Sequence, residues 1–239
     1  MINTLNESQL HKALKSLYAI QNRNSKTEVE FGPYIVDIME ENGTIIEIQT
    51  ASLSHLLAKL NYCISKNRKV IVVHPVFSEK YIETYSQNGK LISSRKSPQK
   101  KNIYGEFREL TKLSKLLLNP LLQIDFVNCA IIEVRTTTDS PVQSKNGRRR
   151  VKKAWLKTEK KLKTLYNTSI FNSPQSYLSL LPESCRKTFT IKKIYSDLKK
   201  EGEKISEQDV RFYVWVLTKA GILSVNKENK TYVYTVCDF

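Results

Sequence analysis

The stretch from Glu28 to Pro75 constrains the fold of this chain most strongly. Asp37 stands inside the apolar run YIVDI, and Glu47 stands inside a second apolar run, TIIEI. The pair Asn42-Gly43 lies between these runs, and Asn-Gly flanked by apolar runs is a strong signal for a β-hairpin. Closing this hairpin would bring the two runs, and the acidic residues within them, side by side.

Acidic residues in apolar strands need a partner, because burying an unpaired carboxylate is costly. Side chains alternate along a strand, so Glu47 and Gln49 share one face, and Asp37 lies beside them if the register allows. Two converging carboxylates supply the oxygen ligands that a hard divalent cation such as Mg²⁺ prefers. The pattern therefore predicts a cation site at Asp37 and Glu47.

The flanking segments predict the rest of the first domain. Leucines at helical spacing predict a helix over residues 6–21, and a second helix follows over 52–65. Strands are expected over 28–37 and 44–50, and the apolar run KVIVVH (69–74) is typical of a buried central strand. This order of elements predicts an α/β sandwich around a mixed sheet.

An Asp, a hairpin and then Glu-x-Lys or a substitute form the core of a known group. Over residues 5–76 the chain resembles the PD-(D/E)XK nuclease superfamily, through Asp37, Glu47 and Gln49. The resemblance implies a restriction-endonuclease-like sandwich in which the acidic pair binds Mg²⁺, with Mn²⁺ as a substitute. Glu7, at the start of the first helix, would complete the metal site. Glu28 and Glu30 on the first strand are alternatives to Glu7.

Two positions depart from the superfamily pattern. The residues Tyr34-Ile35-Val36 replace the proline that commonly precedes the Asp, and Gln49 stands where lysine is usual. Gln49 would then orient the attacking water or hold the scissile phosphate. Lys59, in the following helix, could supply the missing cation. Through HPVFSEKYI, LISSRKSP and its C-terminal third, the chain also resembles an uncharacterised bacterial family that carries this core.

The net charge of +16 is distributed unevenly. Residues 1–90 hold 10 Lys or Arg and 9 Asp or Glu, whereas residues 91–239 hold 29 and 14. A basic half of this strength favours a polyanionic partner, DNA first of all, over an anionic membrane surface. A basic surface kept for solubility is the alternative.

The densest basic segment is expected to be a linker or helix over residues 141–170 that contacts phosphates. Residues 145–163 hold ten Lys or Arg and one Glu. Runs of like charge are often merely solvated, but phosphate contacts would make binding depend steeply on salt. The residues expected to contact DNA here are Lys145, Arg148, Arg149, Arg150, Lys152 and Lys153.

The C-terminal third, residues 171–239, reads as a winged helix-turn-helix that follows the nuclease-like domain of residues 1–140. Three helical segments precede the hairpin ILSVNKENKTYVYTV. Ser206 and Asp209 have capping-box spacing, and Gly221 is placed to end the third helix. Gln208, Arg211 and Phe212 would face the major groove, with Lys227 and Lys230 on the wing. The alternatives are dimerisation and packing on the first domain.

Several function classes find no support in the sequence. No apolar run approaches the ~20 residues of a membrane span, and the N-terminus lacks the basic and apolar regions of a signal peptide. The four cysteines are scattered, which fits a reducing cytoplasm. Walker A and G-x-G-x-x-G loops are absent, so no nucleotide cofactor is expected. The histidines have no H-x-x-x-H spacing, which gives no reason to expect them as metal ligands.

These observations predict a cytoplasmic, Mg²⁺-dependent DNA endonuclease, with restriction or another defence role as one setting. Cutting both strands ordinarily requires two active sites, so a homodimer is one expected arrangement. The alternative is a non-catalytic DNA-binding protein that keeps the nuclease-like scaffold, which the substitution at Gln49 favours. An RNA-directed nuclease also stays open.

Overall fold

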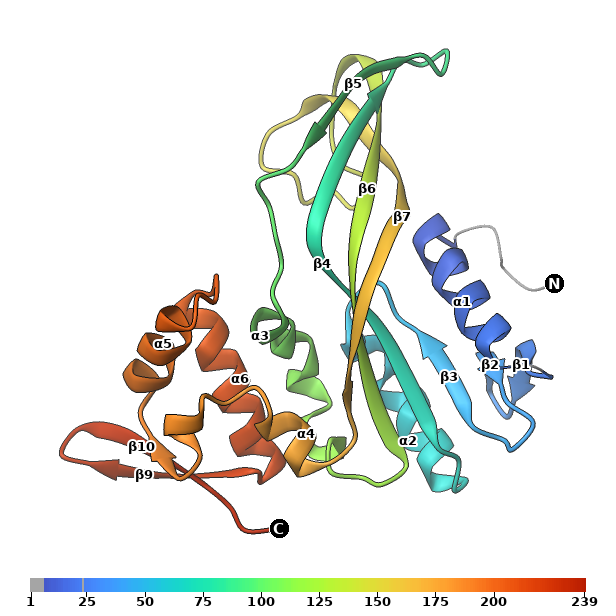
Figure 1. Cartoon of the computed structure of the whole chain (residues 1–239). Coiled ribbons are helices and arrows are strands. Elements are labelled where there is room, and N and C mark those ends of the chain that lie inside the picture. The colour runs from blue at the N-terminus through green and yellow to red at the C-terminus, as the bar shows by residue number, and fades with distance from the viewer. Residues whose placement is uncertain (1–6, 23) are drawn as a thin grey trace.

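The main sheet of the molecule contains parallel and antiparallel strands. We describe a computed structural model of the chain that covers residues 7–22 and 24–239. Strand order is β1-β2-β3-β4-β6-β7, with β5 paired to β4 (Figure 1). β3 is parallel to β4 and β4 to β6, whereas the other neighbours are antiparallel. The prediction of an α/β fold around a mixed sheet is therefore confirmed. The strands are β1 (Lys26–Phe31), β2 (Tyr34–Met39), β3 (Ile45–Ile48), β4 (Val70–Tyr85), β5 (Leu91–Lys96), β6 (Leu122–Val142) and β7 (Lys153–Phe171).

The hairpin predicted from Asn42-Gly43 is present between β2 and β3. Ile38 lies opposite Ile46, and Gly43 adopts a φ of 82° that favours glycine. The strand expected over residues 28–37 is wrong in one respect, because it is two strands that turn at Gly32-Pro33. Gly32 has a φ of 60°, and a Cβ there would lie 1.9 Å from the Tyr62 hydroxyl. Only glycine fits this turn.

Helices cover both faces of the sheet. α1 (Gln9–Gln21) packs Leu10 and Leu14 on one face, against a cluster that includes Ile46 and Ile48. The 3₁₀ turn η2 (Leu53–Leu56) and α2 (Leu57–Ser65) contribute to the core on the other face. Apolar residues of the central strands contribute to both clusters, so each face of the sheet packs against helical segments. Within residues 7–22 and 24–239, no helix has both the length and the apolar character needed to cross a membrane.

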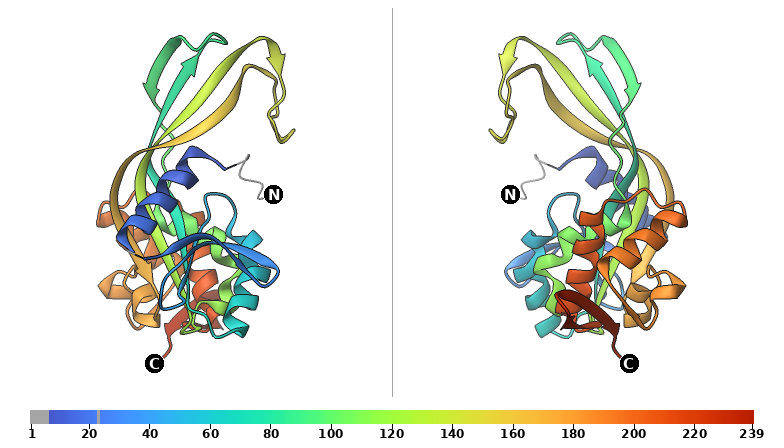
Figure 2. Two further views of the ribbon diagram at one scale, coloured as in Figure 1. Left: turned by 90° about the vertical axis from the view of Figure 1, so that its right-hand side faces the viewer. Right: turned by 90° about the vertical axis from the view of Figure 1, so that its left-hand side faces the viewer.

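The strands β4, β6 and β7 continue well beyond the body of the molecule. Together with β5 they form a curved projection, the β-arm, built from residues 79–97 and 130–165 (Figures 1 and 2). Several register shifts interrupt the pairing of β6 with β7, and such bulges bend and twist a strand. The β6–β7 loop bends back from the tip of the β-arm toward the body of the molecule (Figure 2).

The β-arm corrects the expectation for the basic segment. Residues 153–171 form strand β7, whereas the sequence suggested a linker or helix over 141–170. The domain division expected at residue 140 falls inside β6, which continues as far as Val142. The lysines of this segment lie on an ordered strand because β6 supplies a hydrogen-bonded partner over most of its length.

The C-terminal third forms three helices and a small sheet of order β8-β10-β9. The capping box of Ser206 and Asp209 is present, and Gly221 ends α6 with a φ of 82°. The elements are α4 (Pro174–Leu178), η5 (Glu183–Cys185), β8 (Thr188–Phe189), α5 (Ile191–Lys200), α6 (Glu207–Ala220), β9 (Leu223–Glu228) and β10 (Thr231–Val236).

The C-terminal third packs against the first part of the chain through aromatic side chains. The ring of Tyr213 on α6 lies 4.8 Å from that of Phe107, and its hydroxyl donates to the Tyr177 carbonyl at 2.7 Å. Phe107 begins the 3₁₀ turn η3 (Phe107–Lys112), which follows the short helix α3 (Ile103–Glu106) and precedes the 3₁₀ turn η4 (Ser114–Leu116). One hydrophobic core therefore joins both parts.

Candidate metal centre and basic cleft

Asp37 lies where the start of α1 crosses the β2–β3 hairpin. His11 Nε2 is 3.2 Å from Asp37 Oδ2, and His11 Nδ1 is 3.1 Å from Glu7 Oε1. Ligand atoms of Glu7, His11 and Asp37 all lie within 4.8 Å of one another. The structure thus brings the predicted residues Glu7 and Asp37 together, and it adds His11, which the sequence did not indicate.

The second predicted acid, Glu47, is buried next to Asp37. Its Oε1 accepts a 3.4 Å hydrogen bond from the Asp37 backbone N–H, and the Lys59 ammonium lies 2.5 Å away. Lys59 also donates to the Ile35 carbonyl at 2.6 Å, so it links α2 to β2. The predicted residues Asp37, Glu47 and Lys59 therefore meet. We call Glu7, His11, Asp37 and Glu47 the acid cluster.

The two central carboxyls differ in their protonation. Burial raises the pKa of Glu47 to about 7, an effect that Lys59 opposes and the nearby Asp37 charge adds to. Burial also disfavours a charged Asp37, but His11, the Ile48 backbone N–H and Lys59 together hold the pKa of Asp37 below its ordinary value. One carboxylate is thus held ionised beside a second that titrates near neutrality.

The hydrogen bonds of Gln49 are with residues outside this cluster. Its Oε1 accepts a hydrogen bond from the Ala51 backbone N–H at 3.1 Å, and its carbonyl lies 2.6 Å from His74 Nδ1. Its side chain is partly exposed. Gln49 stands where the PD-(D/E)XK pattern usually has lysine. Its side-chain amide oxygen is hydrogen-bonded to the backbone of Ala51.

Lys15 completes the contacts of the cluster from α1. Its ammonium lies 2.6 Å from Glu7 Oε1 and also pairs with Glu28. Glu28 has a φ of 55°, an uncommon conformation for a residue other than glycine. Glu30, the other alternative ligand, is exposed. Of the two, Glu28 is the one connected to the cluster, through Lys15.

A basic cleft of about 640 Å³ opens next to the acid cluster. It runs from Ser8 at the start of α1 and Thr50 after β3 to the β-arm, where Arg135, Lys157 and Lys160 line it. These three residues were not among the predicted DNA contacts. Residues 153–163 (KAWLKTEKKLK) show no regular alternation of basic with apolar residues, so the sequence contains no clear sign of a strand with two different faces.

The predicted DNA contacts in the basic segment lie at the far end of this cleft. Lys145 and Arg149 line it, whereas Arg148, Arg150 and Lys152 are exposed. Arg149 is used structurally, because it donates to the carbonyls of Val142 and Trp155 and stacks 4.2 Å from the Trp155 ring centre. Lys153 is exposed at the start of β7.

The C-terminal third exposes only part of the predicted surface. Arg211 is exposed and pairs with Glu207 at 2.5 Å, while Phe212 is partly covered, with Arg108 5.7 Å from its ring centre. Gln208 is exposed but lines a hollow against α3 and η3. The outward stripe of α6 continues through Trp215 and Lys219, and the hairpin tip exposes Lys227 and Lys230.

Comparison with known proteins places most of the chain in one family. A protein of Treponema pallidum (strain Nichols), described as uncharacterized, is 33% identical over 188 residues, which cover 76% of this chain and 70% of the relative. No solved structure matches the chain. The family described as Domain of unknown function (DUF8091) matches residues 8–172, from the start of α1 to the end of β7. The chain therefore belongs to the DUF8091 family.

Proposed function

We propose that the chain is a metal-dependent endonuclease that hydrolyses phosphodiester bonds in DNA. The observation that carries this proposal is the acid cluster, where Asp37 meets Glu7 and His11 on one side and Glu47 on the other. The order α1, three antiparallel strands, α2 and a parallel β4 supports the resemblance to the PD-(D/E)XK nucleases. The acids occupy the strands that the resemblance assigns to them.

The donor set fits a divalent cation. Glu7 and Asp37 offer carboxylate oxygens, which suit Mg²⁺ and Mn²⁺, and His11 offers an imidazole nitrogen, which suits transition metals. We therefore expect Mn²⁺ to bind more tightly than Mg²⁺. A bound cation would supply an activated water and stabilise negative charge on the phosphate.

The protein's own residues would position the reactants. Lys59 holds Glu47 in place and brings a positive charge to the cluster, so it takes the role that lysine has at the position of Gln49. The lysines of the basic cleft would neutralise the DNA backbone beside the cluster. Cleavage would then occur where the strand passes between α1 and the β-arm.

The C-terminal third would add affinity or choose the site. Its three helices and hairpin support a winged helix-turn-helix, in which α6 approaches the major groove. Because Phe212 and Gln208 lie toward α3 and η3, the exposed stripe of Arg211, Trp215 and Lys219 is the face we assign to DNA. The tip residues Lys227 and Lys230 would contact phosphates.

The test is cleavage of supercoiled plasmid with Mg²⁺ or Mn²⁺ by the wild type, Asp37→Asn and Glu47→Gln. We expect both variants to lose about a thousandfold in rate, because loss of several kcal/mol of transition-state stabilisation costs tenfold per 1.36 kcal/mol. The control Glu183→Gln removes a carboxylate that is 92% exposed and far along the chain, and it should cleave normally. Cleavage that survives in Asp37→Asn would refute the assigned site.

A second function is a DNA-binding protein without catalysis. The specific observation in its favour is Gln49, whose amide is bonded to Ala51 and leaves no lysine on β3. Its signature is a well-folded wild type that shifts DNA in a salt-sensitive manner and cuts with neither metal.

A further inference from the structure

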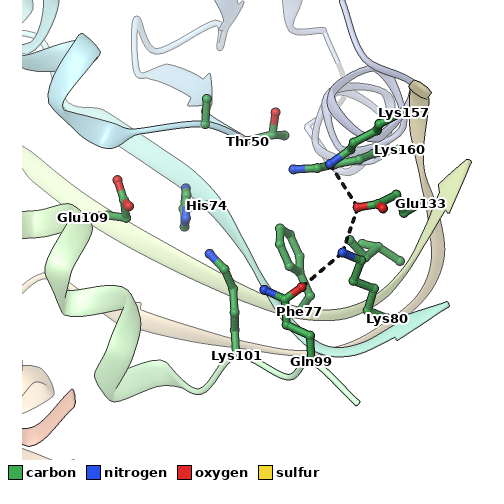
Figure 3. Close-up of a pocket in the computed structure, with 12 residues that line it drawn as sticks. Thr50, His74, Phe77, Lys80, Gln99, Lys101, Glu109, Glu133, Lys157 and Lys160 are labelled. Carbon is green, nitrogen blue, oxygen red and sulfur yellow. Dashed lines mark hydrogen bonds and ion pairs between the residues drawn. The ribbon is translucent and has the colours of Figure 1, made fainter. Parts of the chain in front are cut away.

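A second charged site lies at the base of the β-arm, outside the acid cluster. It is a pocket of about 300 Å³ between β4, β6, β7 and the segment that joins β5 to α3 (Figure 3). We call it the lysine pocket. Its charged lining residues are Lys80, Lys101, Lys157, Lys160, Glu109 and Glu133.

Cations outnumber carboxylates in this pocket. Four lysines face two glutamates, which leaves an excess of two positive charges among the lining residues. One of the glutamates, Glu133, is already shared among Lys80 at 2.8 Å, Lys157 at 3.2 Å and Arg135 at 2.7 Å. These contacts hold the pKa of Glu133 at about 2 against the opposing effect of burial. Glu133 therefore has little capacity left for a fourth cation.

Lys160 is the cation without a counterion. Within the described residues, no carboxylate lies within ion-pairing distance of its ammonium, which instead sits 5.1 Å from the centre of the Phe77 ring. Burial, together with the charges of Lys157, Lys101 and Lys80, lowers the pKa of Lys160 to about 8, although the charge of Glu133 opposes this shift. Holding this charge at neutral pH without a ligand disfavours the folded state.

Lys101 approaches from the opposite wall. Its ammonium lies 4.9 Å from the centre of the same Phe77 ring and 2.8 Å from Glu106 Oε1. Glu106 is also engaged by His74 Nε2 at 3.2 Å. Figure 3 shows Lys101 and Lys160 entering the space between Phe77 and Thr50 from different elements. Two ammonium groups from distant parts of the chain thus share one enclosed space.

We propose that the lysine pocket binds a phosphate monoester through Lys80, Lys101, Lys157 and Lys160. A phosphate monoester carries between one and a half and two negative charges at neutral pH and has three acceptor oxygens, which matches an excess of two positive charges. Charge-assisted hydrogen bonds to such an anion are short and strong. The enclosing walls favour a terminal or free phosphate over a phosphate within a continuous strand.

The lysine pocket lies near the acid cluster, but phosphate binding in the pocket does not depend on the acid cluster. The pocket and the basic cleft share the lining residues Thr50, Ala51, Lys80, Glu133, Lys157 and Lys160. The first two of these follow shortly after β3, the strand that carries Glu47. A phosphorylated strand end held here would lie on the path from the β-arm to the acid cluster. Phosphate binding itself needs no metal and no cleavage, so it can be tested separately from the proposed function.

The test is isothermal titration calorimetry with inorganic phosphate. The buffer contains a metal chelator, and the ionic strength is held constant. We expect the wild type to bind phosphate, Lys160→Met to bind at least tenfold more weakly, and Lys161→Met to bind as the wild type does. Lys161 is the matched control, because it neighbours Lys160 in sequence but is exposed. Equal affinity of the two variants, or no binding by the wild type, would overturn the proposal.

The source of the phosphate is decided by three oligonucleotides of one sequence, with a 5′-phosphate, a 3′-phosphate or only hydroxyl ends. Tighter binding of one phosphorylated form, lost in Lys160→Met, assigns the pocket to that strand end. Phosphate binding without any preference among the three assigns it to a free phosphate compound. A loss in Lys160→Met that is equal for all three oligonucleotides would contradict a monoester site and indicate backbone contact.

Discussion

In the acid cluster every carboxylate has a basic side chain beside it, whereas in the lysine pocket the lysines outnumber the carboxylates. Lys15 and His11 meet Glu7, His11 meets Asp37, and Lys59 meets Glu47. In the lysine pocket, Lys160 has the Phe77 ring and three other lysines around it. The carboxylates of the acid cluster are therefore paired within the chain, whereas Lys160 in the lysine pocket has no carboxylate partner among the described residues.

This difference has an energetic meaning. A basic side chain beside a buried carboxylate offsets part of the cost of burying its charge in the free protein. A half-buried lysine among other lysines is destabilising until an anion arrives, and perturbed groups of this kind are typical of functional sites. The charges of the acid cluster are therefore partly compensated within the chain, whereas the charge of Lys160 is compensated only when an anion binds.

The largest expected effect comes from a substitution in α1 that should impair the acid cluster and leave the lysine pocket unchanged. Leu14→Ala removes a fully buried side chain that fixes α1 to the sheet, and we expect a loss of about 3 kcal/mol in unfolding free energy. Because α1 carries His11, and Glu7 lies just before its N-cap Ser8, cleavage should fall while phosphate binding persists. Urea unfolding and calorimetry measure both. Ile20→Ala, at a residue that is 74% exposed on the same helix, should change neither; equal losses at both sites would contradict their independence.

The pairing in the acid cluster is tested by removing its inner cation. Lys59→Met leaves Glu47 buried without a partner, and we expect a loss of about 2 kcal/mol, below the ~3–5 kcal/mol of a fully buried pair because Glu47 can take up a proton. The exposed Lys12→Met is the control. In a double-mutant cycle, Glu47→Gln should recover part of the loss, and strict additivity of the two changes would show that the pair does not interact.

The balance of the lysine pocket is shifted by Glu133→Gln. We expect a loss of about 1–2 kcal/mol at pH 7, since three cations lose a charged acceptor, together with tighter phosphate binding from the added net charge. Because the folded pKa of Glu133 is lowered to about 2, its stabilisation is present above its unfolded pKa of about 4.5 and lost as the pH falls toward 2. The stability difference between wild type and variant should shrink over that range. Glu79→Gln, in an exposed pair with Lys96, should cost little.

The smallest expected effect is a gain in stability. Lys160→Met should raise the unfolding midpoint by about 2–4 °C, on the order of 1 kcal/mol. The folded pKa of Lys160 is about 8, below the value of 10.5 for a free lysine, so the unfolded chain binds more protons between these values and wild-type stability rises with pH across that window. The gain from the variant should therefore be full below pH 8 and fade above it. A lower midpoint at pH 7 would mean that Lys160 is a structural residue.

Local pattern was sufficient to predict the centre of the fold. Asn42-Gly43 between two apolar runs predicted the hairpin. The hairpin in turn predicted that Asp37 and Glu47 lie on neighbouring strands. The Gly32-Pro33 turn was missed because the residues on both sides of it read as one strand. The basic segment was taken for a linker or helix because its charges suggested solvation, while its strand partner lies in β6.

The remaining site residues could not be found from spacing. His11 reaches Asp37 across 26 residues, and no metal-binding pattern links them. The lysine pocket draws its cations from β4, β7 and the segment after β5, so only the folded sheet brings them together. Contacts at long sequence separation depend on strand register, which the sequence does not specify for the curved, bulged β-arm.

The most direct test of this account is Mn²⁺ binding to the metal-free protein, followed by calorimetry or by the electron paramagnetic resonance signal of free Mn²⁺. We predict saturable binding by the wild type and by Glu183→Gln, and its loss in Asp37→Asn. His11→Gln should bind Mn²⁺ more weakly while affecting Mg²⁺ less, because the imidazole favours a transition metal. Binding that is unchanged in Asp37→Asn would contradict the assignment of the acid cluster as a metal centre.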